Sequence, residues 1–370
     1  MKIALVHDHL ISSGGGERVL EAFTQLWPEA PIFTLIHNEK YAPNFIKGKD
    51  IRTSFLQNLP LATSKYQWYL PLRTYGVESM SLDDYDIVLS NSSAHVKGIK
   101  TSNRTIHINY CHTPTRYLWV NDGMRMDSLE RIWPVSWLSD QYKKYLRKWD
   151  LCASKRVDVF IANSENIRLR IQSIYQRDAR VIYPPVDIKR FLKHVDGGFL
   201  NKREKYFLTG GRLVAYKRFD IVVKAFTKMK IPLKIFGVGP DEMNLRAMAG
   251  GNIEFLGKVE DEDLPGLYAK AQAFINPQEE DFGIIPVEAM ASGTPVISYR
   301  AGGALETVID GITGEFFDDH DWESLAYVVI RFDTNRFDKE FIQNHARKFS
   351  TQNFKDKIKE LVEGVSLEVW

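Results

Sequence analysis

Two glutamates near the end of the chain, Glu280 and Glu288, enclose a segment that could bind a ligand rich in hydroxyls and phosphates. The seven residues between them read Asp-Phe-Gly-Ile-Ile-Pro-Val. Pro286 suits the first turn of a helix, because its ring holds φ near the helical value. Backbone N–H groups at the positive end of such a helix attract anions and polar oxygens. Here those N–H groups would belong to Phe282, Gly283, Ile284 and Ile285.

The carboxylates of Glu280 and Glu288 are expected to bind different hydroxyl groups of the ligand. Glu288 lies about one turn into the predicted helix, where it can accept two hydrogen bonds from a vicinal diol such as a ribose. Glu280 precedes the turn and can reach a second polyol. The alternative is a core helix with solvated acids, but that alternative gives Gly283 no role beside the helix start. The segment therefore predicts a site for a donor that carries both a polyol and a phosphate.

Two basic residues, Arg212 and Lys217, follow a pair of glycines at positions 210 and 211. Arginine presents a planar fork that matches phosphate oxygens, and lysine adds a compact positive charge. A solvated basic turn is the alternative. The glycines end a predicted strand, and parallel sheets bind ligands at the carboxyl ends of their strands. This position favours phosphate binding.

The glycine run Gly14-Gly15-Gly16 lies in a predicted loop between the first strand and the first helix. Glycine permits close approach of the backbone to a ligand, and the helix N-terminus that follows favours negative charge. Phosphate binding and a plain tight turn both remain open on this local pattern. The run is neither a dinucleotide fingerprint nor a P-loop, because the required Gly-x-Gly-x-x-Gly and Gly-Lys-Ser/Thr patterns do not occur here.

His112 is the histidine that we expect to contact a ligand, because it precedes a Thr-Pro turn at the end of a predicted strand. Asn109, Thr113 and Arg116 crowd the same strand end. A lone histidine is more often structural. We expect structural or surface positions for five others: His7, His9, His37, His95 and His107.

Short apolar strands alternate with helices along the whole chain, which predicts an α/β fold with parallel sheets covered on both faces. Before residue 187 the predicted strands are 3–7, 32–35, 87–91, 105–110, 159–163 and 179–182, with helices 17–25 and 165–174. After it the predicted strands are 206–210, 233–237, 253–256, 273–276, 295–299 and 314–317, with helices 220–229, 240–249, 261–270 and 286–292.

Two consecutive prolines, Pro184 and Pro185, stop both helix and sheet and mark a linker. We therefore predict two doubly wound, Rossmann-like domains, 1–187 and 188–350, that face each other across a cleft. Clefts of this kind bind ligands at the carboxyl ends of the strands. The total of 370 residues suits two domains of ordinary size.

The distribution of charge indicates which binding partners are possible, and the cysteine content indicates the cellular compartment. Residues 1–190 carry 26 lysines and arginines against 19 acids, whereas the rest carries 23 against 28. The basic half could face a phospholipid surface or a pyrophosphate-linked acceptor, or the difference could be ordinary scatter. Cys111 and Cys152 have no zinc or disulfide spacing, so we expect a cytoplasmic protein. No signal peptide, membrane span or nucleic-acid motif is expected.

Aromatic and basic residues are mixed in three stretches, 64–75, 131–138 and 142–149. Such mixtures suit a bilayer interface or a polyprenyl-pyrophosphate acceptor. The alternative is a set of helices whose tryptophans face the core and whose lysines are solvated. Peripheral attachment to an anionic membrane, at the inner face of the plasma membrane, is the hypothesis that these stretches raise.

Together these segments resemble the retaining glycosyltransferases of the GT-B fold, specifically family 4, also called group 1. The positions that match are Gly14–Gly16, His112, Asn163-Ser164, Tyr183–Asp187, Gly211-Arg212, Lys217 and Glu280 to Glu288. The starting His-Asp-x-Leu and the run Cys-His-Thr-Pro-Thr-Arg-Tyr-Leu-Trp look most like bacterial mannosyltransferases of O-antigen and exopolysaccharide synthesis. In this fold a C-terminal helix, here about residues 351–370, commonly packs back on the N-terminal domain.

The resemblance implies a role for each matching residue. Arg212 and Lys217 would hold the donor diphosphate, Glu288 the ribose, and Glu280 the hydroxyls of the transferred sugar. The N–H groups of Phe282, Gly283, Ile284 and Ile285 would help to bind that sugar. Gly15 and Gly16 would lie on the phosphate side, and His112 would contact the sugar near the reacting carbon. The nucleotide base would lie near Val259.

The implied reaction is hexosyl transfer with retention, in which the leaving phosphate accepts the proton of the acceptor. No Asp-x-Asp metal motif is evident, so neither a metal nor a cofactor is expected, and Arg212 and Lys217 would supply the positive charge. GDP-mannose is the expected donor, and a glycan or polyprenyl-pyrophosphate-linked molecule the expected acceptor. The alternatives are a UDP-sugar donor carrying N-acetylglucosamine or glucose, a non-catalytic nucleotide-sugar-binding protein, and an epimerase.

Overall fold

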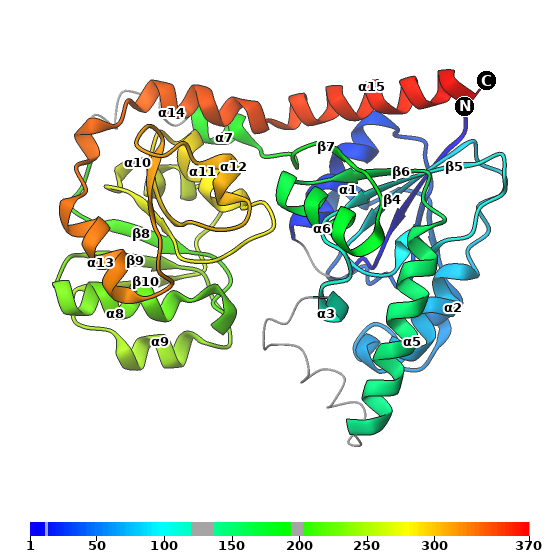
Figure 1. The fold of residues 1–370 in the computed structure, drawn as a ribbon, viewed down its shortest axis with the longest axis horizontal. Helices are drawn as coiled ribbons and strands as arrows, with labels where there is room; N and C mark the ends of the chain where they lie inside the picture. Colours follow the sequence, from blue (N-terminus) through cyan, green and yellow to red (C-terminus); the bar gives the residue numbers. More distant parts are fainter. Residues whose placement is uncertain (12–13, 120–135, 194–202, 370) are drawn as a thin grey trace. The chain divides into compact units, whose positions relative to one another are not determined.

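The computed structural model describes residues 1–11, 14–119, 136–193 and 203–369 of the chain (Figure 1). It divides into two compact units, each with its own internal contacts. Unit 1 comprises Met1–Tyr183 and Lys355–Trp370, and unit 2 comprises Pro184–Phe354. The chain therefore passes into unit 2 at the Tyr183-Pro184 bond and returns to unit 1 inside its last helix, α15 (Thr351–Val369).

Unit 1 is built on a seven-stranded parallel sheet with the order β3-β2-β1-β4-β5-β6-β7. Its strands are β1 (Ile3–His7), β2 (Ile32–Thr34), β3 (Ile51–Thr53), β4 (Ile87–Ser92), β5 (Ile106–Cys111), β6 (Val159–Ala162) and β7 (Arg180–Val181). The three central strands, β1, β4 and β5, are buried throughout. Burial of every successive residue is typical of strands in a sheet covered on both faces.

Helices and short 3₁₀ turns connect these strands. The α-helices of unit 1 are α1 (Gly15–Leu26), α2 (Arg73–Glu78), α3 (Arg116–Trp119), α5 (Ser136–Ser154) and α6 (Glu165–Tyr175). The 3₁₀ turns are η1 (Asn44–Ile46), η2 (Phe55–Asn58), η3 (Tyr66–Leu72) and η4 (Val96–Gly98). From α15, Ile358, Leu361, Val362 and Val365 are buried, at the spacing of one helix face.

Unit 2 is built on a six-stranded parallel sheet with the order β10-β9-β8-β11-β12-β13. Its strands are β8 (Phe207–Gly210), β9 (Leu233–Phe236), β10 (Ile253–Gly257), β11 (Phe274–Asn276), β12 (Val296–Tyr299) and β13 (Gly314–Phe317). One large core cluster joins this sheet to α8 and α13 through side chains such as Phe226, Ile235 and Leu325.

The helices of unit 2 cover both faces of its sheet. They are α7 (Ile188–Lys193), α8 (Phe219–Met229), α9 (Glu242–Met248), α10 (Leu264–Lys270), α11 (Ile284–Ala291), α12 (Ala304–Thr307), α13 (Trp322–Arg331) and α14 (Lys339–Ala346). Two further 3₁₀ turns precede or follow them, η5 (Ala215–Lys217) and η6 (Thr334–Arg336), and η7 (Arg347–Phe349) leads into α15. In Figure 1, α8 and α9 lie on one face of the sheet and α10 and α11 on the other.

The prediction of α/β architecture with parallel sheets is confirmed, but several local expectations were wrong. Gly15 and Gly16 are the first residues of α1 and not part of a loop, because Gly14 already occupies the extended N-cap position. α11 starts two residues earlier than expected, at Ile284. β3 was not predicted, because it is a short and largely exposed edge strand with a single apolar residue.

Candidate functional site

In unit 2 the N-terminus of α11 is shaped by three glycines. Gly283, its N-cap, has φ +90°, a left-handed conformation that glycine adopts at little cost. The segment before it lies directly against Gly302 and Gly303. A Cβ atom at Gly302 would stand 2.3 Å from the carbonyl oxygen of Glu280, and one at Gly303 would stand 2.3 Å from that of Phe282. The Gly-Gly pair after β12 therefore packs against this turn, a contact that the sequence did not predict.

Lys217 and Glu280 form an ion pair beside that helix start. The distance from Lys217 Nζ to Glu280 Oε1 is 2.8 Å, with 10% of the lysine side chain and 22% of the glutamate side chain exposed. A Cβ atom at Gly211, after β8, would lie 3.0 Å from Ile285 Cδ1 and 3.8 Å from Lys217 Nζ. Two segments predicted to share a ligand thus meet in the folded unit. Their direct pairing was not predicted, because Lys217 was assigned to the diphosphate of the donor and Glu280 to its sugar.

The other predicted residues of unit 2 differ in exposure. Arg212 is exposed after β8, and among the residues that the structure describes no hydrogen bond or ion pair holds its guanidinium. Glu288 is buried within α11, one turn beyond its start. Val259 is partly buried and follows Gly257, where β10 ends. Gly211 therefore lies beside both Lys217 Nζ and Ile285 Cδ1, and Val259 is not among its close neighbours.

In unit 1 three strand ends and α1 bring polar residues around Gly16. A Cβ atom at Gly16 would lie 3.5 Å from His7 Cε1 and 3.6 Å from His112 Nε2. Asn91 of β4 contacts all three residues: its side chain lies 2.7 Å from the Gly16 carbonyl oxygen, 2.5 Å from His112 Nε2 and 3.1 Å from His7 Nδ1. His7 also lies 3.6 Å from Glu17 Oε1.

From the sequence we expected His7 to be a structural or surface histidine, and Asn91 was assigned no role. Both belong to the cluster around His112, because β1, β4 and β5 are neighbours in the sheet and end at the same edge. Only the strand order could have revealed this. His107, in contrast, is buried beside Ser90, 2.7 Å from its Oγ, as expected of a structural histidine.

Burial sets the protonation of these rings. It lowers the pKa of His112 to about 4, with a further decrease from His7, so the ring is neutral at pH 7. Burial likewise lowers the pKa of His95 to about 3 and that of His107 to about 4. His112 is thus suited to hydrogen bonding as a neutral group rather than to holding an anion by charge.

Asp8, next to His7, anchors the loop after β4. Its carboxylate accepts backbone N–H bonds from four successive residues, Ser93, Ala94, His95 and Val96, at 2.8 to 3.1 Å. Burial acts to raise the pKa of Asp8, but the nearby histidines and these N–H groups outweigh it and hold the pKa well below its ordinary value. The end of β1 and the loop after β4 are therefore fixed to each other.

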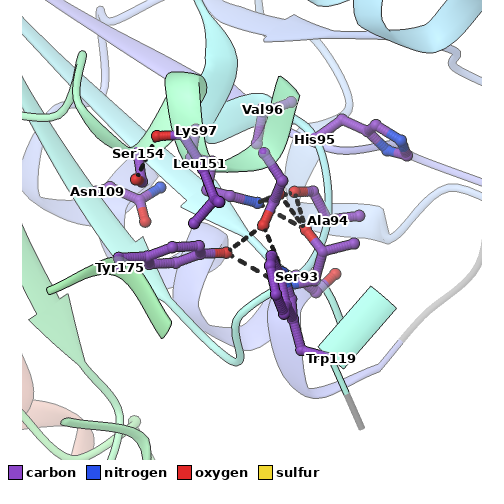
Figure 2. A network of polar contacts seen from close by, with 12 residues as sticks. Ser93, Ala94, His95, Val96, Lys97, Asn109, Trp119, Leu151, Ser154 and Tyr175 are labelled. Atoms are coloured by element: carbon purple, nitrogen blue, oxygen red, sulfur yellow. Dashed lines mark hydrogen bonds and ion pairs between the residues drawn. The ribbon is translucent and has the colours of Figure 1, made fainter. Parts of the chain in front are cut away.

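A buried ion pair holds the segment after β5. Lys97 and Asp150 are each 1% exposed, and Lys97 Nζ lies 2.6 Å from Asp150 Oδ1. Thr115 lies within 2.7 Å of both charged groups, while Trp119 Nε1 and Tyr175 Oη donate to Asp150 Oδ2 at 2.8 and 2.7 Å. Figure 2 shows Lys97, Tyr175 and Trp119 converging from different elements. The network joins η4, α3, α5 and α6.

No group of three or more His, Cys, Asp or Glu side chains with metal-binding geometry occurs among residues 1–11, 14–119, 136–193 and 203–369. Over the same ranges, no helix has the length and apolar character needed to cross a bilayer.

Two family models match nearly the whole chain: "Glycosyltransferase Family 4" over residues 13–190 and "Glycosyl transferases group 1" over residues 193–355. A GDP-mannose-dependent alpha-(1-6)-phosphatidylinositol monomannoside mannosyltransferase of Mycolicibacterium smegmatis is 32% identical over 199 residues, which cover 46% of this chain and 52% of that protein. Mannosylfructose-phosphate synthase of Agrobacterium fabrum is 26% identical over 267 residues, which cover 64% and 58%. The chain thus spans about half the length of these curated relatives.

Solved structures share the fold at low sequence identity. HepE of Anabaena in complex with UDP superposes with a TM-score of 0.71 at 18% identity, over 98% of this chain and 100% of that one. Sucrose-phosphate synthase of Thermosynechococcus elongatus superposes with a TM-score of 0.72 at 15% identity, over the full length of both chains. With two parallel α/β sheets and both family matches, the chain belongs to the GT-B glycosyltransferases of group 1 and family 4, a retaining-type family.

Proposed function

We propose that this glycosyltransferase transfers mannose from GDP-mannose, with retention, to a glycan or polyprenyl-pyrophosphate-linked acceptor in cell-surface polysaccharide synthesis. The observation that carries the proposal is the Lys217–Glu280 pair beside the N-terminus of α11. A cation, a carboxylate and the N–H groups at a helix start together suit a ligand with a diphosphate and a polyol. Mannose is favoured because two of the relatives carry it in their names.

Within this proposal Lys217 and the exposed Arg212 stabilise the negative charge that develops on the leaving diphosphate. We propose that these two cations meet that need without a metal ion. Glu280 orients the lysine ammonium and accepts hydrogen bonds from the transferred sugar, and Glu288 accepts them from the ribose. Phe282, Gly283, Ile284 and Ile285 supply N–H groups, and Val259 lies near the base.

In unit 1 we propose that His112 contacts the donor sugar near the reacting carbon, with Gly15 and Gly16 on the phosphate side. The leaving phosphate accepts the proton of the acceptor hydroxyl as the new glycosidic bond forms on the same face of the sugar. The bond between the sugar carbon and the phosphate oxygen breaks in that step. No protein nucleophile is assigned.

The alternative donor is a UDP-sugar, which the UDP bound to HepE makes the next candidate. A non-catalytic nucleotide-sugar-binding protein is less well supported, because the charged residues that would stabilise a leaving group are all in place. The identity of the stabilising donor separates GDP-mannose from a UDP-sugar, and turnover separates an enzyme from a non-catalytic binding protein.

Donor binding is tested by thermal unfolding of the full chain with GDP-mannose, UDP-glucose, UDP-N-acetylglucosamine, ADP-sugars and dTDP-sugars. At a ligand concentration about 100 times Kd, binding adds about 2.7 kcal/mol to the free energy of unfolding. For a domain of this size each kcal/mol raises Tm by about 2–4 °C. We expect this shift with GDP-mannose and its loss in Glu288→Gln. Stabilisation by a UDP-sugar alone would rule out the GDP-mannose assignment.

We further propose that unit 1 docks on an anionic membrane through an aromatic patch, defined as Trp68, Leu72, Tyr75 and Tyr145. Between 38% and 59% of each of these residues is exposed. Tyr142 Oη donates to the Leu70 carbonyl oxygen at 3.0 Å, which joins α5 to η3. Exposed cations accompany the patch: Lys65, Lys144, Arg147 and Lys148. The aromatic stretch at 131–138 lies outside the residues whose side chains the structure describes.

Flotation with phosphatidylglycerol-containing vesicles tests this docking. We expect the full chain to float, and the double substitution Trp68→Ser and Tyr75→Ser to reduce the bound fraction by about tenfold, since interfacial aromatic side chains anchor proteins at bilayers. The matched control is Tyr327→Ser with Ile330→Ser, which removes two side chains that are 66% and 70% exposed on α13. Equal flotation of the two double variants would argue against the aromatic patch.

A further inference from the structure

Asn91 links the two histidines around Gly16 in a way that constrains their protons. Its amide group contacts Gly16, His7 and His112, with distances of 2.7 Å from Nδ2 to the Gly16 oxygen, 3.1 Å to His7 Nδ1, and 2.5 Å from Oδ1 to His112 Nε2. Asn91 is 1% exposed and His7 is 4% exposed. These contacts are therefore shielded from water and set by the protein itself.

The Gly16 carbonyl decides which way the Asn91 amide is turned. A carbonyl oxygen can only accept a hydrogen bond, so the Asn91 atom that faces it must be the amide nitrogen. The opposite orientation would place two acceptor oxygens 2.7 Å apart. The second amide proton then points to His7 Nδ1, and the Asn91 oxygen faces His112 Nε2.

This orientation dictates the position of one proton on each ring. An oxygen that faces His112 Nε2 requires that nitrogen to carry the proton, which leaves Nδ1 of a neutral ring as an acceptor. An N–H that faces His7 Nδ1 requires that nitrogen to be bare. The His7 proton is then on Nε2, the nitrogen 3.6 Å from Glu17 Oε1. No hydrogen bond among the described residues uses Nδ1 of His112.

We infer that Asn91 is a positioning residue that holds His112 as its Nε2–H tautomer and so leaves Nδ1 to accept a hydrogen bond from a substrate hydroxyl. The inference rests on the proposed function, since it assigns the chemistry that His112 can offer. A bare imidazole nitrogen binds a sugar hydroxyl, which can donate, and repels a phosphate oxygen, which cannot. His112 therefore selects the polyol part of the ligand and not its diphosphate.

The charged and titratable neighbours of His112 come from two elements besides β5. His7 and Asp8 belong to the β1 end, and Glu17 belongs to α1; the Tyr110 ring contacts the His112 ring at 5.2 Å. His7 opposes protonation of His112, whereas Glu17 and Asp8 favour it, and burial outweighs all three. The ring is therefore neutral near pH 7, so its tautomer is the property that matters for binding.

The tautomer is measured by long-range ¹H–¹⁵N NMR of the full chain labelled with ¹⁵N-histidine, in which His112 is assigned by the signal lost in His112→Gln. We expect a protonated Nε2 and a bare Nδ1 in the unsubstituted chain. In Asn91→Leu, which keeps similar volume and removes the amide, we expect mixed tautomers. The matched control is Asn163→Leu, because Asn163 Nδ2 donates to the His112 main-chain oxygen at 3.0 Å and not to its ring.

A protonated Nδ1 in the unsubstituted chain, or an unchanged tautomer in a folded Asn91→Leu variant, would overturn the inference. If Asn91→Leu does not fold, Asn91→Asp supplies the second measurement. Its carboxylate would accept from both rings and raise the pKa of His112 by about 1–3 units, which the same NMR signals report on titration. An unchanged pKa there would also contradict the inference. These readouts need no substrate, so an incorrect donor assignment would leave them intact and would be seen separately in the thermal-shift screen.

Discussion

Lys217→Ala is expected to lower kcat by about 10²–10³-fold, the usual cost of removing one preorganised group that stabilises developing negative charge. The ammonium is held 2.8 Å from Glu280 Oε1, in a position with only 10% exposure of its side chain. A cation fixed in advance does not need to reorganise when the diphosphate leaves. Alanine removes that charge, and water would have to stabilise the leaving group instead.

The fold of unit 2 should survive this substitution. Glu280 keeps 22% of its side chain exposed, so its carboxylate can be hydrated once the lysine is gone. Initial rates with saturating donor, together with circular dichroism, test both expectations. Lys224→Ala, which removes an exposed lysine of α8, is the matched control and should retain activity. Near-normal kcat in a folded Lys217→Ala variant would remove Lys217 from the diphosphate site.

Asp150→Ala is expected to destabilise unit 1 by about 3–5 kcal/mol, because it leaves the buried Lys97 ammonium without a counter-charge. The carboxylate also accepts from Trp119 and Tyr175, whose donors would lose their partner. Burial acts to raise the pKa of Asp150, but Lys97 and the hydrogen bonds from Thr115 and Trp119 outweigh it and lower the pKa, so the group is ionised at neutral pH. The loss is therefore that of a true ion pair.

Urea unfolding followed by tryptophan fluorescence reports mainly on unit 1, because Trp322 is the only one of the eight tryptophans in the unit 2 sequence. Asp140→Ala, an exposed acid on the same helix, is the matched control and should change stability by less than about 0.5 kcal/mol. The pair Lys97→Met with Asp150→Leu should lose less than Asp150→Ala, since neither charge remains buried alone. A small loss in Asp150→Ala, or a larger loss in the pair, would contradict this account.

Local sequence patterns were sufficient to predict the central strands of both sheets. Runs such as Ile3–His7 and Phe207–Gly210 begin with consecutive apolar residues, and they form buried parallel strands. Edges carry less information: β3 has one apolar residue in three and was missed. Helix starts near glycine were displaced by up to two residues, since N-cap geometry depends on contacts such as those between Gly302 and the turn before Gly283.

The sequence by itself determined the family, the α/β class, and the residues around Glu280, Lys217 and His112 that deserve testing, because these depend on short runs of adjacent residues. Only the tertiary structure decided which of them touch. Lys217 meets Glu280 across 63 positions of sequence, and Asn91 meets His7 across 84. Such contacts follow from strand order and from burial, which bring distant side chains to one sheet edge and exclude water there. Neither strand order nor burial can be read from the spacing of residues along the chain.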